Sequence, residues 1–241
     1  GSGAIAEAWL IAPTARYAHF VLGARYEAGG LAVRTRAGAV VTLILPEDEV
    51  FEDRQPRLAD LDGDGEDEIV LVKSHLRLGA ALAAIALSGG RLGILAETPP
   101  IGRPNAWLNP AGIADFDGDG RADIAVVQQP HVLGLLRVWS LRGGRLVEIA
   151  SLPDVSNHVI GSPALGLSAV ADFDGDGIAD LALPSRDRGW LRFLSFAGGV
   201  REIARRRLPA PAASDFELDR GDGKPGVIVG LADGRRIRVL P

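Results

Sequence analysis

The chain has 241 residues, of which 47% are hydrophobic, and its formal net charge is −5 at pH 7. It contains no cysteine, which excludes disulfides and zinc or redox chemistry based on thiolates. The longest apolar runs fall short of the ~18 residues of a membrane span, and the one basic run, Arg205–Arg207, is too short for a nucleic-acid footprint. We therefore expect neither a membrane span nor a nucleic-acid partner.

The N-terminal region predicts β-strands without any acidic motif. Gly1–Gly3 resembles an expression scar, so we expect that a native signal peptide was removed. Lysine occurs only at Lys73 and Lys224, and the other basic residues are arginine, which indicates a bacterial source or a designed sequence. Strands are expected over 6–12 and 17–22, and residues 31–45 read as a hairpin that turns at 36–38.

Three copies of one acidic loop follow along the chain. Each copy has acids at positions one, three, five and nine and glycines at positions four and six. The glycines permit a sharp bend with positive φ, and carboxylate oxygens are the ligands that Ca²⁺ takes. The sequence therefore predicts about three Ca²⁺ sites. Their expected ligands are Asp60, Asp62, Asp64, Glu68, Asp115, Asp117, Asp119, Asp123, Asp172, Asp174, Asp176 and Asp180.

Each acidic loop is expected to join two strands rather than two helices. A helical EF-hand loop needs a Glu at position twelve, where this chain has Leu71, Val126 and Leu183. Short apolar runs lie directly before and after each loop, and these runs read as strands. The alternative to a metal site is an acidic surface turn that binds no ion.

The loops mark a repeat of four short strands. After each loop and its strand come a polar turn, a third strand, a Gly-Gly turn and a fourth strand, which is the pattern of a propeller blade. We predict an all-β fold, with metal-loop blades near 57–101, 112–154 and 169–209. Degenerate blades are expected near 13–50 and 211–241, the latter with a decayed acidic copy that starts at Asp215.

The blade count follows from how the ends of the chain are used. The C-terminal region offers three strands, and the strand near 6–12 is left over, so we predict that it completes and closes the last blade. This gives a single β-propeller domain over 4–241 with five blades. Four blades is the alternative.

At the level of motifs, 113–124 and 170–181 read Ala-Asp-Phe-Asp-Gly-Asp-Gly-x-x-Asp-Ile/Leu, and 58–69 matches with Glu68 in place of the last Asp. This pattern resembles the FG-GAP/VCBS repeat family, which includes the propellers of integrin α-subunits. The resemblance implies calcium-binding blades and an extracytoplasmic location. It does not specify a function, because relatives include adhesion receptors, lectins and modules attached to enzymes.

The connections at the opposite end of the blades from the acidic loops are the longest, and such loops commonly carry function. We predict that they bind a polar ligand, with Trp107 as a stacking platform. The expected ligand-binding residues are Arg103, Asn105, Trp107, Asn109, Asn157 and His158.

Three functions remain open from the sequence. The first is a monomeric, non-catalytic binding or adhesion module whose ligand is a carbohydrate or a protein. The second is a structural or engineered scaffold. The third is an enzyme that acts on polysaccharide, although no nucleophile-elbow or phosphate-loop motif is present and the regular acids are committed to metal.

Overall fold

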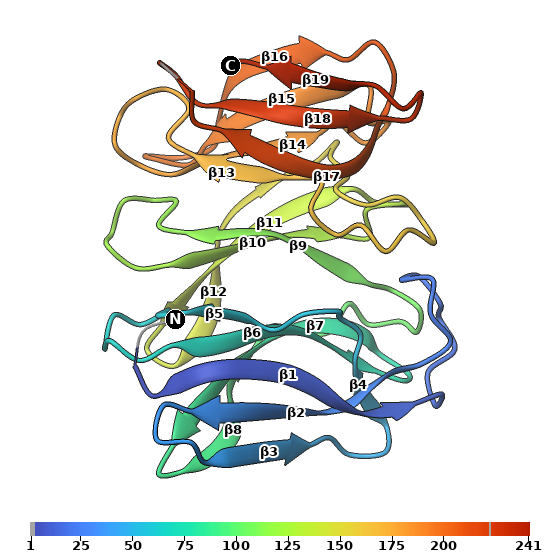
Figure 1. Cartoon of the computed structure of the whole chain (residues 1–241), viewed down its shortest axis with the longest axis vertical. Coiled ribbons are helices and arrows are strands. Elements are labelled where there is room, and N and C mark those ends of the chain that lie inside the picture. The colour runs from blue at the N-terminus through green and yellow to red at the C-terminus, as the bar shows by residue number, and fades with distance from the viewer. Residues whose placement is uncertain (1–2, 222) are drawn as a thin grey trace. The chain divides into compact units, whose positions relative to one another are not determined.

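A computed structural model describes residues 3–221 and 223–241, and all regular secondary structure within these ranges is β (Figure 1). Gly1 and Ser2 of the predicted scar lie outside the described residues. The described chain groups into two compact units. One contains the residues up to Leu108 together with Leu141–Val147, and the other contains Asn109–Ser140 and Glu148–Pro241.

The first unit is built on an eight-stranded antiparallel sheet. Its main path runs β1–β2–β4–β6–β7–β8, with β3 paired to β2 and β5 paired to β6. The strands are β1 (Ile5–Thr14), β2 (Glu27–Thr35), β3 (Val40–Ile44), β4 (Glu49–Phe51), β5 (Arg57–Ala59), β6 (Glu68–His75), β7 (Gly79–Ser88) and β8 (Arg91–Glu97).

The N-terminal strand does not close the last blade, and that prediction is wrong. β1 pairs antiparallel with β2, from Ile5 opposite Thr35 to Thr14 opposite Glu27 (Figure 1). Ile5 is buried in the same hydrophobic cluster as Leu31 of β2. Pairing with the next strand closes only a short loop, which costs less chain entropy than pairing with a strand near the other end of the sequence.

The region between β1 and β2 also differs from the prediction. The strand expected over 17–22 is an irregular segment with a turn, in which the amide of Gly23 donates to the carbonyl of Phe20. Its apolar residues Tyr17, Val21 and Leu22 are nevertheless buried. An apolar run therefore marked a buried segment here but not a strand. The hairpin expected over 31–45 is confirmed by the pairing of β2 with β3.

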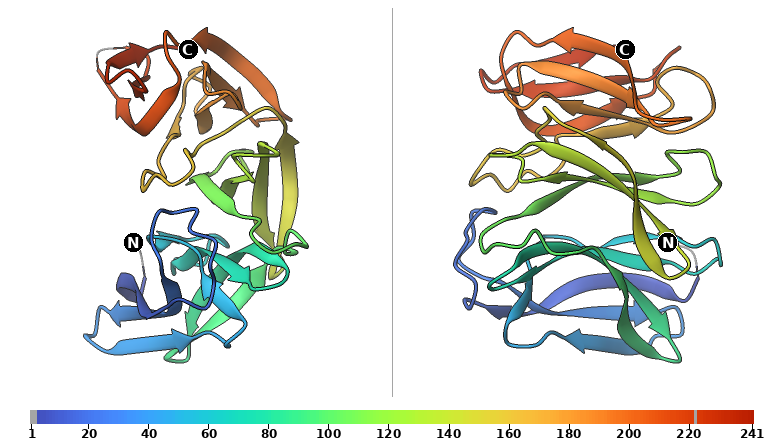
Figure 2. Two further views of the ribbon diagram at one scale, coloured as in Figure 1. Left: turned by 90° about the vertical axis from the view of Figure 1, so that its right-hand side faces the viewer. Right: turned by 180° about the vertical axis from the view of Figure 1, so that it is seen from behind.

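Three further antiparallel sheets follow along the chain, and Figure 2 shows their strands from two more sides. The last two belong to the second unit, and the first has most of its residues there. β9–β12 and β13–β16 are four-stranded in the predicted order, and β17–β19 is three-stranded. The strands are β9 (Leu108–Ala114), β10 (Asp123–Gln128), β11 (Leu135–Arg142), β12 (Arg145–Leu152), β13 (Ala169–Ala171), β14 (Asp180–Pro184), β15 (Trp190–Ser195), β16 (Arg201–Arg207), β17 (Ala212–Asp219), β18 (Gly226–Leu231) and β19 (Arg236–Val239).

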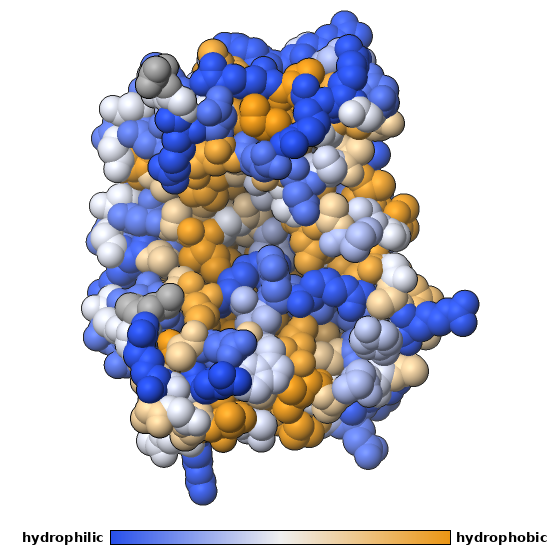
Figure 3. Space-filling model, in the orientation of Figure 1, coloured by the Kyte–Doolittle hydropathy of each residue, from blue (hydrophilic) through white to orange (hydrophobic). Residues whose placement is uncertain are grey.

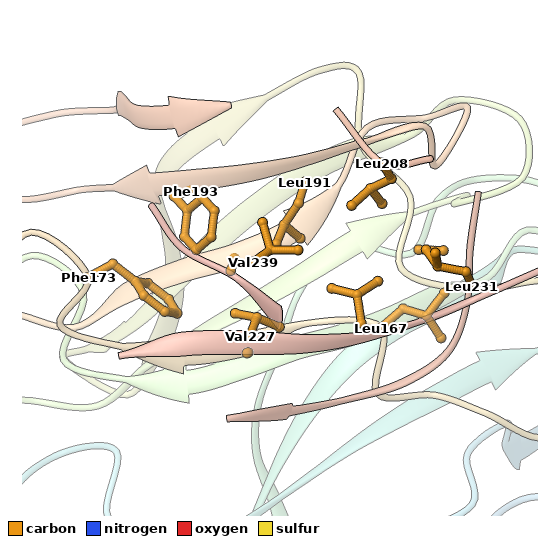
Figure 4. Close-up of a cluster of buried hydrophobic side chains, with 12 residues drawn as sticks. Leu167, Phe173, Leu191, Phe193, Leu208, Val227, Leu231 and Val239 are labelled. Atoms are coloured by element: carbon orange, nitrogen blue, oxygen red, sulfur yellow. The ribbon is translucent and has the colours of Figure 1, made fainter. Parts of the chain in front are cut away.

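Alternation along the strands places apolar side chains on both faces of the β13–β16 sheet. Leu181 and Leu183 of β14 pack in the cluster shared with β10 and β11. Ala182, one residue on, packs in the cluster shared with β17–β19. Figure 4 shows this second cluster, with Phe173 and Phe193 at one end and Leu208 and Leu231 at the other. Successive sheets of this unit are therefore joined through apolar cores.

The surface is mixed in polarity. On the face drawn in Figure 3, hydrophilic residues cover much of the molecule and hydrophobic residues gather in smaller patches between them. Among the described residues, no helix is long and apolar enough to cross a membrane.

Candidate metal-binding loops

Each acidic loop joins the first and second strands of one repeat, as predicted. The loops connect β5 to β6, β9 to β10 and β13 to β14. In the middle loop, Gly118 and Gly120 have φ values of +81° and +86°. These values lie in the region that favours glycine, so positions four and six produce the bend. The equivalent glycines of the other two loops have the same sign of φ.

The acid at position one organises the backbone of its loop. One carboxylate oxygen of Asp115 accepts from the amide of Gly118 at 2.8 Å, and the other accepts from the amide of Gly120 at 2.9 Å. Asp60 and Asp172 make the same two contacts in their loops. The glycine amides are thus satisfied by a side chain, and the loop is wrapped around this acid.

The acid at position nine lies at the start of the second strand and is buried. Oδ2 of Asp123 accepts from the amide of Phe116 at 3.1 Å, and Oδ2 of Asp180 accepts from the amide of Phe173 at 2.8 Å. The two phenylalanines are fully buried. Oδ1 of both acids is also buried and makes no hydrogen bond of good geometry among the described residues. The hydroxyls of Ser140 and Ser195 lower the pKa of Asp123 and Asp180 but do not satisfy Oδ1. A buried carboxylate oxygen without a partner is costly, so it indicates a ligand that would satisfy it.

Three of the four predicted acids converge in each loop. The acids at positions one, three and nine have ligand atoms within 4.8 Å of one another. The three clusters are Asp60, Asp62 and Glu68; Asp115, Asp117 and Asp123; and Asp172, Asp174 and Asp180.

The predicted ligands at position five lie outside these clusters. Asp64, Asp119 and Asp176 each accept the amide two residues further on, at 2.8 to 3.0 Å. The structure therefore gives position five a role in the turn, and its role as a ligand stays a prediction.

The electrostatics of the clusters favour a bound cation. The pKa of Asp123 is raised to about 6, chiefly by burial. The hydroxyl of Ser140 and the amide of Phe116 oppose this shift, and the charges of Asp117 and Asp119 add to it. Burial likewise raises the pKa of Glu68 to about 7 and that of Asp180 to about 6. The clusters consist of carboxylate oxygens, the ligands that hard cations prefer. The residues present therefore fit Ca²⁺, which would remove the repulsion among the acids.

The acidic loops and the Gly-Gly turns lie at the same end of a sheet. In the third repeat, Arg201 at the start of β16 donates to Oδ2 of Asp174 in the loop at 2.5 Å. In the first repeat, a cavity of about 230 Å³ is lined by Asp62 and Asp64 of the loop and by Ser88 at the end of β7. Both observations are expected from the antiparallel strand order, in which the first-to-second and third-to-fourth connections lie at one end of a sheet.

The decayed fourth copy does not form a loop of this kind. Asp215, Glu217 and Asp219 lie on strand β17. Oδ1 of Asp215 accepts from the amide of Gly166, and the other two acids pair with Arg236 and Arg238 of β19. Asp222 of this copy lies outside the described residues. The described acids of this copy are thus committed to protein contacts.

The predicted ligand-binding residues are divided between the two units. Arg103, Asn105 and Trp107 belong to the first unit, and Asn109, Asn157 and His158 belong to the second. Arg103 and Asn105 are exposed. Trp107 is only 3% exposed, and its indole N–H donates to the carbonyl of Glu52 at 2.9 Å. The exposed stacking platform expected at Trp107 is therefore wrong, because the ring packs into the unit.

The three predicted residues of the second unit are fully buried. The side-chain amide of Asn109 donates to the carbonyls of Asn157 and Leu165, at 3.1 and 3.0 Å. Asn157 donates in return to the carbonyls of Asn109 and Pro110. His158 contacts the ring nitrogen of His131 at 2.8 Å and the carbonyl of Ser162 at 2.9 Å. These contacts fix the long connections, and ligand binding by these residues stays a prediction.

Sequence reasoning missed a group of buried acids in the first unit. Glu27, Glu52 and Asp53 are at most 3% exposed. Glu52 contacts His19 Nδ1 and the hydroxyl of Ser74, both at 2.5 Å. The segment 46–54 is one of the long connections expected at the end of the blades opposite the acidic loops, but it contains β4. The short apolar pair Val50 and Phe51 within it was the available signal of burial.

Together these features define an all-β protein whose repeats carry an acidic, cation-type loop between their first and second strands. A model of the FG-GAP-like repeat matches the chain twice, over residues 60–126 and 115–183. Because these matches together cover more than half of the sequence, the chain belongs to the FG-GAP-like repeat family. A comparison with curated protein sequences found no match.

Proposed function

We propose that the chain is a calcium-stabilised, non-catalytic binding module whose ligand is a carbohydrate or a protein. The observation that carries the calcium proposal is the set of three acidic clusters, each with ligand atoms within 4.8 Å of one another. Binding or adhesion is typical of repeats in this family, which supports the second half of the proposal.

Calcium would be held by the acids at positions one, three and nine of each loop. In the middle loop these are Asp115, Asp117 and Asp123. The orphaned Oδ1 of Asp123 supports this assignment, because an ion would satisfy it. The ion would tie together the start of the loop and the second strand, and so would stabilise the sheet. The ion supplies positive charge and oxygen coordination, and no chemical step is implied.

Calcium titration tests this proposal. An ion that binds only the folded state adds about 2.7 kcal/mol per site at 100 times its Kd. We expect titration calorimetry to give about three Ca²⁺ per chain, and the melting temperature to rise clearly from chelator to millimolar Ca²⁺. Mg²⁺ at the same concentration should have a smaller effect, because it requires a stricter geometry and keeps its waters. A melting temperature that is the same in chelator and in Ca²⁺ would contradict the proposal.

We also propose that the repeat sheets are blades of a propeller-type domain, and that the protein is a monomer. The four-strand order of β9–β12 and β13–β16 supports this. A compact domain of 241 residues has a radius of gyration of about 18 Å. Small-angle scattering should give this value together with a monomeric mass, and a much larger radius would contradict a single compact domain.

The ligand proposal rests on the exposed residues Arg103 and Asn105. An extracytoplasmic location supports it, because calcium is plentiful there and repeats of this family are generally extracellular. A glycan array probed with calcium-loaded protein is the direct test. The double variant Arg103→Ala with Asn105→Ala should lose the signal, whereas Arg121→Ala, an exposed change in the middle acidic loop, should keep it. Full binding by the double variant would contradict the assignment.

A further inference from the structure

A solvent-accessible cavity in the first unit is separate from the acidic loops. Its volume is about 340 Å³, within the range of small-molecule sites. Its walls come from three segments: β1, the start of β2 and the two residues Asp53 and Arg54 that follow β4. The lining residues are Leu10, Ile11, Pro13, Tyr26, Glu27, Ala28, Asp53 and Arg54. Most of the wall is therefore apolar, with charged groups confined to three residues.

One oxygen of the Glu27 carboxylate, Oε2, is the buried acceptor of this cavity that has no hydrogen bond from a described residue. The Glu27 side chain is 1% exposed. The nearest cation is Arg54, whose Nη1 lies 4.0 Å from this oxygen. That distance is too long for a hydrogen bond. The other terminal nitrogen of Arg54 donates to the carbonyl of Leu22 at 3.1 Å.

The neighbouring acids have partners, which sets Glu27 apart. The two oxygens of Asp53 accept from the amides of Arg54 and Val72 and from the guanidinium of Arg57. Glu52 accepts from Ser74 and contacts His19. The pKa of Glu27 is raised to about 8, chiefly by burial and then by the charge of Glu52. The charge of Arg54 opposes this shift, and that of Asp53 adds to it. A buried carboxylate oxygen whose nearest cation lies 4.0 Å away costs free energy that a closer cation would recover.

We propose that this cavity binds a primary ammonium group on an apolar body of about four carbons, with Glu27 as its anionic partner. The ammonium would fill the position that Arg54 reaches only at 4.0 Å. The carbon chain would lie against Leu10, Ile11 and Pro13. Tyr26, which is 57% exposed, also lines the cavity and would lie beside the chain. This site is independent of the calcium proposal, because no acidic-loop residue lines it.

The test is a titration at pH 9, where Glu27 is ionised and an alkylamine is still protonated. The probes are butylamine, butanol and butyrate, which share an apolar body and differ in charge. We expect butylamine to shift the backbone amide resonances of Tyr26, Glu27 and Ala28 with a saturating curve in the millimolar range, and the other two probes to leave them in place. An equal response to butanol would show that the cavity binds apolar groups without regard to charge. A response to butyrate would show that Arg54, rather than Glu27, selects the ligand. Either result would overturn the proposal.

Two variants separate binding from folding. Glu27→Gln keeps the shape and removes the charge, and it should weaken butylamine at least tenfold while the protein stays folded. Glu7→Gln is the matched control, because Glu7 lies on β1 with a 57% exposed side chain and should bind butylamine like the parent. Retained binding by Glu27→Gln would overturn the proposal. A short acetylated peptide with one lysine, compared with butylamine, then distinguishes a protein lysine from a free amine as the source of the ammonium.

Discussion

The acidic loop of the second repeat and the strand β17 contain the same kinds of residues and fold differently. Both begin with an acid followed by Phe and carry acids at positions one, three and five. In the loop, the acids at positions one, three and nine meet within 4.8 Å. On β17, Asp215, Glu217 and Asp219 extend along the strand and contact backbone or arginine. Acidic composition alone therefore does not make a cation site.

The difference lies at positions four, six and nine. The loop has Gly118 and Gly120, both with positive φ, and ends in the buried Asp123. The fourth copy has Leu218 and Arg220 at the glycine positions, and it has Gly223 where the last acid would stand. Without residues that adopt positive φ freely, the chain continues as a strand. The glycines and the ninth acid thus convert an acidic sequence into a closed cluster.

The largest effect is expected from a substitution of the acid at position nine of a loop. Asp123→Asn should abolish calcium binding at the middle loop and lower the stability of the calcium-loaded protein by up to about 2.7 kcal/mol at 100 times the Kd. In chelator the sign should reverse, because the substitution removes one of three crowded carboxylates. Melts with and without Ca²⁺ measure both values. If the substitution changed the melting temperature in the same direction with and without Ca²⁺, the acid at position nine would not be what distinguishes the loop from β17.

A glycine substitution should have the next largest effect. Gly120→Ala places a side chain at φ +86°, although no atom lies within 4 Å of the added Cβ. The cost is therefore conformational, about 1–2 kcal/mol. Gly93→Ala in β8 is the matched control, since it also has open space but no positive φ. Denaturant titration should show a lower free energy of unfolding only for Gly120→Ala. Equal stability of the two variants would mean that positive φ at Gly120 is not required for the loop.

The ion pair at the third loop should produce a smaller effect. Arg201 competes with a cation for Asp174, so Arg201→Ala should tighten calcium binding at that loop by a factor between about 1.4 and 5, as expected for a pair worth about 0.2–1 kcal/mol. Arg206→Ala removes the same charge from the same strand and is the control. Calorimetry compares the two variants. If Arg206→Ala tightened binding equally, general charge would explain the effect.

The smallest effect is expected on β17. Glu217 pairs with Arg236 at 2.6 Å, but the two side chains are 66% and 58% exposed. Glu217→Ala should therefore change stability by less than about 0.5 kcal/mol, and it should leave the number of bound Ca²⁺ unchanged. Thermal melts and calorimetry measure these two quantities. A lost calcium site would place β17 among the cation-binding segments.

The repeat was predictable from sequence because its signals are local. Acids, glycines and Gly-Gly turns recur at constant spacing, and this spacing predicted the strand order of the β9–β12 and β13–β16 sheets. The pairing of β1 was not predictable in the same way, because either end of the chain could supply a partner for an apolar strand. Pairing between distant segments depends on the entropy of loop closure and on which face of the strand is buried. A short stretch of sequence specifies neither.

The sites divide along the same line. The clustered acids of positions one, three and nine follow from a motif. The burial of Trp107 and Asn157, and the isolation of Glu27 in its cavity, depend on contacts between segments far apart in sequence. An exposed tryptophan and a buried one can have the same sequence neighbours, so the sequence around Trp107 could not predict its burial.

Asp123, the acid at position nine of the middle loop, would couple calcium binding to the interior of the protein. One oxygen of Asp123 holds the amide of Phe116, while the other stands where an ion would bind. The ring of Phe116 in turn meets that of Phe196 edge to face, with centroids 5.4 Å apart. A bound ion would therefore affect the hydrogen bond of the Phe116 amide proton in the interior. The rate at which that proton exchanges with solvent deuterium would serve as a local gauge of the ion, one loop at a time.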